Sequence, residues 1–415
     1  MRKMKDSGVA WLGEIPEDWA VVFNKHLMKK VKCIREKYTG EDVLSLTMKG
    51  VLIRDLDNPS GKMPATFDGY QFVEAGNLLM CLFDIDVTPR CIGLIKNDGV
   101  CSPAYSQFKL NDLADAEYYY YYYLNLDNTK ELLHLAKNLR HSLTEEQFGS
   151  IPTALPPLDV QKKISHKLER KVSEADALIT NVQAQIEKLK AYKQSLITEV
   201  VTKGLDPNVP MKDSGVEWIG EIPEDWEVVK TGRLFKENNR SPIGNDIPLS
   251  LSQADGLVAT DDMKESALKT SSYDNWKRVE IGDLVLNRFK AHLGVLFAAN
   301  LTGIVSFHYG VYEAKRSLVP KFYEYLYHSN QYKAILGNAS NGMVVGLQNL
   351  SNLGFYSTYS LYPPYAEQEK LVSHLDKKCS EIDELITVKQ AKIEKLEQYK
   401  RSLIYEYVTG KKEVS

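Results

Sequence analysis

Tyr362–Tyr365 reads YPPY and is the strongest candidate for a catalytic motif in this chain. The tetrad is close to (D/N/S)PP(Y/F/W), with which amino-methyltransferases hold the amine that they methylate. Tyr362 offers a phenol where such a site usually places an amide or carboxylate acceptor. An equivalent pair of prolines at Leu155–Leu158 reads LPPL and has no tyrosine. Because proline suits the first turn of a helix, we interpret both pairs as helix starts.

No other catalytic motif stands in a convincing setting. The sequence lacks GxxxxGK(S/T), HExxH and GxSxG, and no strand-flanked glycine-rich loop for a nucleotide or a methyl donor is evident. Cys81, Cys91 and Cys101 stand ten residues apart without a CxxC pair, so small buried thiols in strands are expected rather than a metal site. We therefore predict no catalytic residue, no metal ligand and no cofactor bound by this chain.

The chain repeats itself at an offset of 207 residues. MKDSGVAWLGEIPEDWAVV begins at Met4 and MKDSGVEWIGEIPEDWEVV begins at Met211, and only three of the nineteen positions differ. The block that starts LPPLDVQKKI matches the block that starts YPPYAEQEKL at the same offset. Residues 23–154 (the first insert) and 230–361 (the second insert) resemble each other only faintly. Such a repeat predicts two similar modules on a shared framework that address two different targets.

Two long helices are predicted within the repeated framework. Residues 159–201 contain neither glycine nor proline, and apolar residues recur there at a spacing of three and four. That spacing is typical of a coiled-coil seam, and about 40 residues would span roughly 60 Å. Lys193, Lys389 and Lys400 interrupt the seams. An antiparallel pair of helices with one globule at each end is expected; the alternative is one amphipathic helix packed on each globule.

Composition bounds the class of protein. The chain has 415 residues, 43 % of them hydrophobic, a formal net charge of −3 and five cysteines. These values predict two or three globular domains without a disulfide framework. No apolar run is long enough for a membrane span and the N-terminal sequence lacks the apolar core of a signal peptide, so a cytoplasmic location is expected. The net charge does not by itself indicate a nucleic-acid binder, although it does not exclude a local basic groove.

Each insert is expected to be mixed α/β with prominent strands. Strand signals in residues 42–52 and 73–83 have counterparts in residues 247–258 and 279–289, and a helix is expected after them in each copy. Six consecutive tyrosines, Tyr118–Tyr123, would suit a base-stacking platform. Their counterpart KFYEYLYHS at Lys321 indicates ordinary helix packing, which we favour.

The combination of repeated blocks resembles the specificity (S) subunit of type I restriction–modification enzymes. The resemblance is carried by GEIPEDW at Gly13 and Gly220, by the two Pro-Pro blocks, and by the helix tails QSLITEVVTKGL and RSLIYEYVTGK. GDLVLNRFKAHLGV and GIVSFHYGVY in the second insert also look like the family's pattern. In the first insert, DIDVTPRCIGLI at Asp84 departs from that pattern.

The resemblance implies an α+β protein. Two mixed α/β target-recognition domains would be separated by two long helices that form an antiparallel coiled coil with a pseudo-two-fold repeat. The expected boundaries are 1–154 for the first repeat segment and recognition domain, 155–204 for the first helix, 205–361 for the linker, second repeat segment and second recognition domain, and 362–415 for the second helix.

The resemblance also implies a function. Each recognition domain would read one half of a bipartite, asymmetric double-stranded DNA target, while the helices set the spacing and dock two methyltransferase (modification) subunits. Those subunits would carry S-adenosylmethionine and methylate adenine N6, and restriction subunits would add ATP- and Mg-dependent translocation and cleavage. The chain itself would be non-catalytic and would have no membrane partner.

The resemblance implies a reading surface on loops, so the candidate binding residues are polar side chains at strand ends and in the loop before each helix entry. Arginine and glutamine are the natural readers of guanine and adenine edges. The DNA-binding candidates are Lys49, Arg90, Arg140, His141 and Ser142 in the first insert and Arg288, Lys290, His292, Ser340, Asn341 and Gln348 in the second. The repeated segments supply four tryptophans, which are interpreted first as packing anchors and second as partner-docking residues. These are Trp11, Trp19, Trp218 and Trp226.

Two other classes of protein stay open. The chain could be a self-contained methyltransferase or a nuclease–methyltransferase fusion, which a methyl-transfer assay on the isolated chain would reveal. It could also be a coiled-coil scaffold that binds only protein, which predicts no salt-dependent affinity for DNA.

Overall fold

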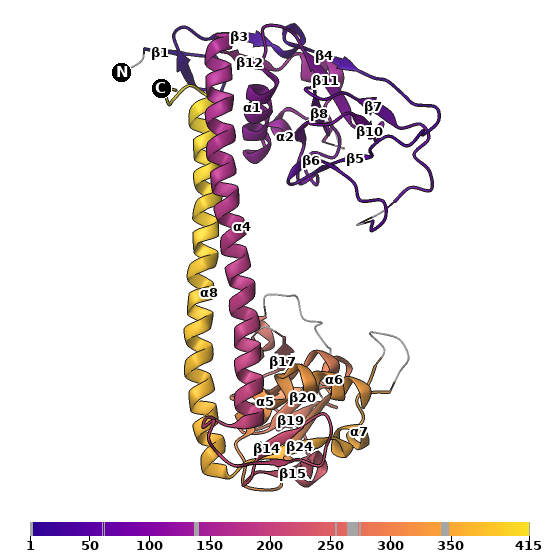
Figure 1. The fold of residues 1–415 in the computed structure, drawn as a ribbon, viewed down its shortest axis with the longest axis vertical. Helices are drawn as coiled ribbons and strands as arrows, with labels where there is room; N and C mark the ends of the chain where they lie inside the picture. The colour runs from indigo at the N-terminus through magenta and orange to yellow at the C-terminus, as the bar shows by residue number, and fades with distance from the viewer. Residues whose placement is uncertain are drawn as a thin grey trace. The chain divides into compact units, whose positions relative to one another are not determined.

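The computed structural model describes residues 3–59, 61, 63–136, 141–253, 255–263, 273, 275–341 and 348–414. The chain divides into two compact units (Figure 1). The first unit comprises Met1–Gln183 with Gln390–Ser415, and the second comprises Ala184–Lys389. Each unit therefore contains one insert together with a segment of both long helices. None of the described helices is both long and apolar enough to cross a membrane.

The first unit is built around a four-stranded antiparallel sheet in the order β4-β11-β8-β9. Two-stranded pairs β1-β2, β3-β12, β5-β6 and β7-β10 surround it. The elements are β1 (Met4–Asp6), β2 (Glu14–Pro16), β3 (Ala20–Phe23), η1 (Asn24–His26), β4 (Met28–Val31), β5 (Leu44–Thr47), β6 (Gly50–Ile53), β7 (Gln71–Val73), β8 (Leu78–Met80), β9 (Ile92–Leu94), β10 (Gly99–Cys101), β11 (Ser106–Leu110), α1 (Ala116–Asn128), α2 (Glu131–Leu135), α3 (Glu145–Gly149), β12 (Pro152–Leu155) and α4 (Leu158–Lys203), which continues into the second unit.

The second unit follows the same path with the sheet order β16-β23-β20-β21 and the pairs β13-β14, β15-β24, β17-β18 and β19-β22. Its elements are β13 (Met211–Asp213), β14 (Glu221–Pro223), β15 (Glu227–Lys230), η2 (Thr231–Arg233), β16 (Phe235–Glu237), β17 (Leu249–Ser252), β18 (Gly256–Ala259), η3 (Thr260–Asp262), β19 (Lys277–Val279), β20 (Leu284–Asn287), η4 (Arg288–Leu293), β21 (Leu296–Ala298), β22 (Gly303–Val305), β23 (Tyr309–Ala314), α5 (Pro320–His328), α6 (Asn330–Asn338), α7 (Asn352–Ser357), β24 (Tyr359–Tyr362) and α8 (Tyr365–Val408). The two inserts thus share one topology although their sequences have drifted apart.

Helices α4 and α8 lie side by side and run antiparallel, as predicted (Figure 1). In the second unit the ammonium of Lys193 contacts the carboxylate of Asp383 at 2.6 Å, and Lys389 donates to the side-chain oxygen of Gln185 at 2.6 Å. In the first unit Lys400 pairs with Asp176. Lys193 and Lys400 are related by the 207-residue offset, as are Asp176 and Asp383, so the same interhelical contact occurs once in each unit.

The predicted apolar seam is largely buried. On α4 the seam positions Leu168, Ala175 and Val182 are at most 4 % exposed. On α8 Leu375 is 0 % exposed and Leu403 is 4 % exposed. The two helices therefore gain stability by packing on each other and on the insert cores, because apolar area is removed from water on both sides. The predicted pairing of the two helices is confirmed, and each insert core packs against segments of both helices rather than against one helix alone.

The tyrosine run forms one face of the first unit's core and is not a stacking platform. Tyr118, Tyr119 and Tyr123 in α1 are each 0 % exposed. The hydroxyl of Tyr118 donates to the carbonyl of Val408 in α8 at 3.0 Å, and that of Tyr119 donates to the carbonyl of Ala154 at 2.9 Å. Because their hydroxyls find partners, these tyrosines can be buried at little cost. The structural interpretation of this run is confirmed.

The Pro-Pro pairs start the long helices. Backbone amides of Glu367 and Gln368 donate to the carbonyl of Pro364, which is the first turn of α8. The buried side chain of Gln368 donates to the carbonyl of Pro363 at 2.8 Å and accepts from the amide of Val319 at 2.9 Å. This glutamine ties the helix entry to the chain before α5. Its counterpart, the buried Gln161, makes the same contacts in the first unit: Nε2 donates to Pro156 at 2.8 Å and Oε1 accepts from Asp115 at 2.8 Å.

The repeated segments pack against helix ends through their tryptophans. Trp19 is 1 % exposed and Trp226 is 0 % exposed, and the indole of Trp226 donates to Glu367 at 2.9 Å. Gly410, just after α8, has φ +72° and lies so close to Pro16 that an added Cβ would approach Pro16 Cδ to 2.4 Å. Trp19 and Trp226 therefore serve as anchors, while the partly exposed Trp11 and Trp218 remain predicted docking residues.

Candidate nucleic-acid interface

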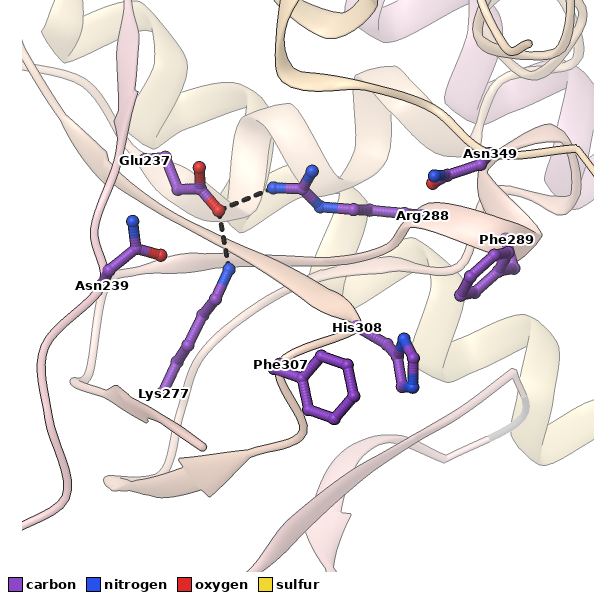
Figure 2. A pocket seen from close by; sticks show the side chains of 8 residues that line it. All are labelled: Glu237, Asn239, Lys277, Arg288, Phe289, Phe307, His308 and Asn349. Atoms are coloured by element: carbon purple, nitrogen blue, oxygen red, sulfur yellow. Dashed lines mark hydrogen bonds and ion pairs between the residues drawn. The ribbon is translucent and has the colours of Figure 1, made fainter. Parts of the chain in front are cut away.

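The second unit contains a polar pocket of about 400 Å³ (Figure 2). Four of its charged or aromatic residues come from different elements: Glu237 ends β16, Lys277 begins β19, Arg288 begins η4, and Phe307 lies between β22 and β23. The residues that line the pocket are Glu237, Asn239, Lys277, Arg288, Phe289, Phe307, His308 and Asn349.

Antiparallel pairing brings these distant residues together. In the central sheet Glu237 of β16 pairs with Tyr312 of β23, and Asn287 of β20 pairs with Tyr309. The side chain of Asn287 accepts from the amides of Phe289 and Lys290 at 3.1 and 3.2 Å. An asparagine cap of this kind ends the strand and starts the next helical turn. The NRFK sequence therefore places Arg288 directly at the strand end.

A single carboxylate holds both cations of the pocket. Glu237 Oε1 accepts from Arg288 Nη2 at 2.6 Å and from Lys277 Nζ at 2.7 Å, as the dashed lines in Figure 2 show. Lys277 also donates to the carbonyl of Tyr309 at 3.1 Å, and Arg288 donates to Asn352 Oδ1 at 2.8 Å. Burial acts to raise the pKa of Glu237, but the hydrogen bonds from Lys277 and Asn352 and the charge of Arg288 outweigh burial and hold that pKa below its ordinary value.

Exposed aromatic rings stand beside these charges. Phe289 is 41 % exposed and Phe307 is 53 % exposed. The ring centroid of His308 lies 3.9 Å from that of Phe307 and 5.6 Å from that of Phe289. Flat apolar faces next to hydrogen-bond donors suit a nucleobase, which offers a π face and acceptor atoms on its edge.

The structure places the six candidates of the second insert differently. Arg288 lines the pocket. The backbones of Asn341 and Asn349 exchange two hydrogen bonds of 3.0 and 2.9 Å, which holds Asn349 at the pocket. Lys290 is exposed and Gln348 is partly exposed. The remaining two point elsewhere, because the hydroxyl of Ser340 donates to Leu336 at 2.7 Å and His292 packs against Gly337.

The five candidates of the first insert are also dispersed. Lys49 is exposed at the β5–β6 turn and lines a cavity of about 330 Å³. Arg90 lines a separate cavity of about 300 Å³ and contacts the carboxylate of Asp127 at 3.5 Å. His141 has φ +45° and Ser142 is partly exposed. Arg140 lies outside the described residues. The roles of these five residues stay predictions.

Sheet register identifies which residues of the first unit occupy the pocket positions. Phe108 of β11 takes the place of Tyr312 and pairs with Lys30, while residues 71 and 82 align with 277 and 288. The equivalents of Glu237, Lys277 and Arg288 are therefore Lys30, Gln71 and Leu82. Gln71 donates to the carbonyl of Tyr105 at 2.7 Å, which is the counterpart of the Lys277–Tyr309 contact. The scaffold is the same in both copies, while the side chains at these positions differ in charge and polarity.

Most of the residues that line the pocket were not predicted from the sequence. Glu237, Lys277, Phe307, His308 and Asn349 were not among the candidates. Their only signal was position at a strand end or in the adjoining turn, which became visible once the strand register was known. Among the described residues, no three His, Cys, Asp or Glu side chains gather as a metal site.

The sequence of this chain is similar to those of known proteins. Residues 91–188 match the model of the type I restriction modification DNA specificity domain. A protein described as the MjaX specificity subunit of a type I restriction enzyme, from Methanocaldococcus jannaschii, is 27 % identical over 313 residues, which are 71 % of this chain and 68 % of that protein. The MjaVIII specificity subunit of the same organism is 28 % identical over 282 residues, which are 64 % of this chain and 63 % of that protein. The chain is therefore similar in sequence to the specificity subunits of type I restriction–modification enzymes.

Solved structures have a fold similar to that of this chain. A chain from a structural study of complex assembly and conformational transition in the type I R-M system has a TM-score of 0.68 at 15 % identity, with 95 % of this chain and 98 % of that chain covered. The HsdS subunit from Thermoanaerobacter tengcongensis has a TM-score of 0.52 at 16 % identity with the same coverage. At such identities the likeness extends to the fold alone.

Proposed function

We propose that this chain is a specificity subunit that reads a bipartite, asymmetric DNA sequence, with one half-site for each insert domain. The observation that carries the proposal is a single topology present twice with different side chains at equivalent pocket positions. A shared scaffold would place both reading surfaces alike, while Glu237, Lys277 and Arg288 against Lys30, Gln71 and Leu82 would give them different codes. Two half-sites read by one chain multiply their discrimination, because the second is engaged at high effective concentration.

The chain acts within this proposal as a non-catalytic recognition subunit. Methyl transfer from S-adenosylmethionine to adenine N6 and ATP- and Mg-dependent cleavage belong to the modification and restriction subunits. The paired helices α4 and α8 set the spacing between half-sites. A paired rod suits that role because a backbone in two packed helices cannot stretch without breaking its hydrogen bonds.

Equivalent apolar side chains on the long helices fit docking of two identical partners. In the first unit Leu178 and Tyr399 are each 48 % exposed, and in the second Leu385 is 51 % and Tyr192 is 57 % exposed. Leu178 and Leu385 are related by the 207-residue offset, as are Tyr192 and Tyr399. Each unit therefore presents one leucine and one tyrosine at equivalent places, and a methyltransferase subunit that binds one pair also fits the other.

Methylation mapping tests the function directly. A host that carries this gene with its modification gene is expected to gain methyladenine in one two-part motif that is absent without this gene. Exchanging the first and second inserts is expected to reverse the order of the two half-sites in that motif. Methyl transfer by the isolated chain would favour the enzyme alternative, and DNA affinity that does not depend on salt would favour a protein-binding scaffold.

A further inference from the structure

The charges of the second-unit pocket are unequally matched. Lys277, Arg288 and Glu237 have side chains that are 14 %, 18 % and 15 % exposed. Two cations and one anion leave a net formal charge of +1 (2 − 1) at this spot. Without the carboxylate the same pocket would carry +2 and would attract a phosphate more strongly.

Hydrogen-bond donors in the pocket are not all used. A guanidinium has five N–H groups, yet within the described residues Arg288 makes its side-chain contacts through Nη2 alone, so the N–H groups of Nη1 stay free for a ligand. The ammonium of Lys277 donates one N–H group to Glu237 and one to the carbonyl of Tyr309, which leaves its third N–H group for a ligand. The pocket therefore suits a ligand that has hydrogen-bond acceptors on its edge and a flat aromatic face, as a purine base does.

We propose that Glu237 determines specificity by holding Lys277 and Arg288 in a fixed geometry while it cancels part of their charge. The pocket then takes the neutral, acceptor-bearing edge of a guanine in preference to a phosphate. Attraction for a phosphate scales with the net charge of the pocket, whereas hydrogen bonds to O6 and N7 of guanine depend mainly on donor geometry. Phosphate contacts position a protein on DNA, whereas base contacts specify the site. A pocket that prefers guanine to phosphate therefore favours sequence-specific binding over non-specific binding. The inference rests on the proposed DNA-reading function.

Glu237→Gln removes the negative charge while keeping the shape of the side chain. We expect the full-length chain, purified with its co-expressed modification subunit, to bind a scrambled duplex about 3- to 10-fold more tightly at low salt. The slope of log affinity against log salt concentration is expected to steepen by about one, because one more phosphate is engaged. Preference for the methylation-mapped target over the scrambled duplex is expected to fall by a similar factor.

A charge-restoring variant separates charge from structural damage. Glu237→Gln combined with Lys277→Met returns the pocket to +1, so the salt slope and the affinity for the scrambled duplex are expected to return to those of the unmodified chain. Misfolding would not be repaired by a second substitution in the same pocket. Lys277→Met alone leaves the Glu237–Asn352 contact in place and is expected to weaken binding of the scrambled duplex and to lower the slope by about one, which keeps the proposal testable if Glu237→Gln does not fold.

A matched control removes the same charge elsewhere in the second unit. Glu227 pairs with Arg316 at 3.5 Å, its side chain is 60 % exposed, and it does not line the pocket. Glu227→Gln is expected to leave the slope and the target preference unchanged. Equal effects of the two glutamate substitutions would overturn the proposal in favour of net charge alone.

An error in the proposed DNA-reading function and an error in the role of Glu237 would give different experimental results. If the unmodified complex shows no preference for its mapped target, the proposed function itself is wrong. If it shows that preference and Glu237→Gln changes neither slope nor preference, only the role of Glu237 is wrong. Replacing each guanine of the half-site by 7-deazaguanine supplies the final check, since loss of N7 is expected to weaken the unmodified complex more than an Arg288→Ala complex.

Discussion

Replacing Lys400 by leucine tests how the helix pair is held together. The side chain of Lys400 is 17 % exposed and contacts Asp176 across the helix pair and Glu397 in its own helix at 3.4 Å. Asp176 is 54 % exposed, so solvent screens the interhelical pair. A half-exposed ion pair contributes about 0.2–1 kcal/mol, and desolvating the ammonium offsets part of that.

The substitution is expected to leave stability unchanged or to raise it by up to about 1 kcal/mol. Leucine suits a helix seam, and fully burying it is worth about 1.5–3 kcal/mol. The lysine stem already covers part of the same surface, so only a fraction of that value is gained, and loss of two screened ion pairs offsets about 1 kcal/mol of it. Asp176→Ala, by contrast, leaves the half-buried ammonium with one partner and is expected to lower stability by about 0.5–1 kcal/mol.

Urea unfolding followed by far-UV circular dichroism measures these changes. The expected order of stability is Lys400→Leu equal to or above the unmodified chain, with Asp176→Ala below it. Lys190→Leu is the matched control, because Lys190 is 54 % exposed and its ion pair, among the described residues, is with Glu187 of the same helix; stability is expected to change little. A loss of more than 1 kcal/mol for Lys400→Leu would refute the reasoning, since the charged pair would then be worth more than the apolar contact that replaces it.

Three further predictions concern the framework and the second module. Gly410→Ala is expected to destabilise the chain by about 2–4 kcal/mol through both a contact clash and a strained φ, whereas Gly13→Ala, with φ +61° and nothing within 4 Å of the added Cβ, is expected to cost only about 1 kcal/mol; thermal unfolding of both variants checks this. Gln368→Ala leaves buried backbone groups without partners, and urea unfolding is expected to show a loss of about 2–4 kcal/mol. Burial, together with the charge of Lys333, lowers the pKa of His328 to about 4. Between about pH 6.5 and pH 4 the unfolded chain therefore binds a proton at this histidine, whereas the folded chain does not. Stability is therefore expected to fall by about 1–3 kcal/mol between pH 6.5 and pH 4, and unfolding at both pH values should show this difference shrink in His328→Gln.

The framework could be predicted from sequence because its signals are local or repeated. Both long helices follow from apolar spacing and from the Pro-Pro pairs, and the tyrosine run was correctly interpreted as helix packing from its counterpart. The two-fold relation follows from the offset of 207 residues. The interruptions in the seams were noticed, but their partners were not. Lys193 and Lys400 pair with Asp383 and Asp176, residues that only the antiparallel register brings opposite.

The pocket could not be predicted, because its residues meet only through sheet pairing. Glu237 and Lys277 are 40 residues apart in sequence, and Glu237 and Arg288 are 51 apart. Arg288 was chosen for its chemistry and its place at a strand end, and that choice does bring it to the pocket. Its ion pair with Glu237 changes what it can do, since a guanidinium already held by a carboxylate reads DNA with its remaining donors. Residue type and strand position could not reveal that constraint.

The pocket contacts differ between the two units, whereas the framework contacts repeat. This difference decides which residues must change when the DNA target of a unit is changed. In the second unit Glu237 contacts the neutral Asn352, while the equivalent pair in the first unit is Lys30 with Glu145 at 3.8 Å. The charge at the strand position is reversed, and its partner changes with it. Placing lysine alone at position 237 would set three cations together with no anion among them, at a cost that grows with their burial. Changing the target of one unit therefore requires coordinated substitutions within the pocket. The buried glutamines at the helix entries, Gln161 and Gln368, and the lysine–aspartate pairs between the helices can stay as they are.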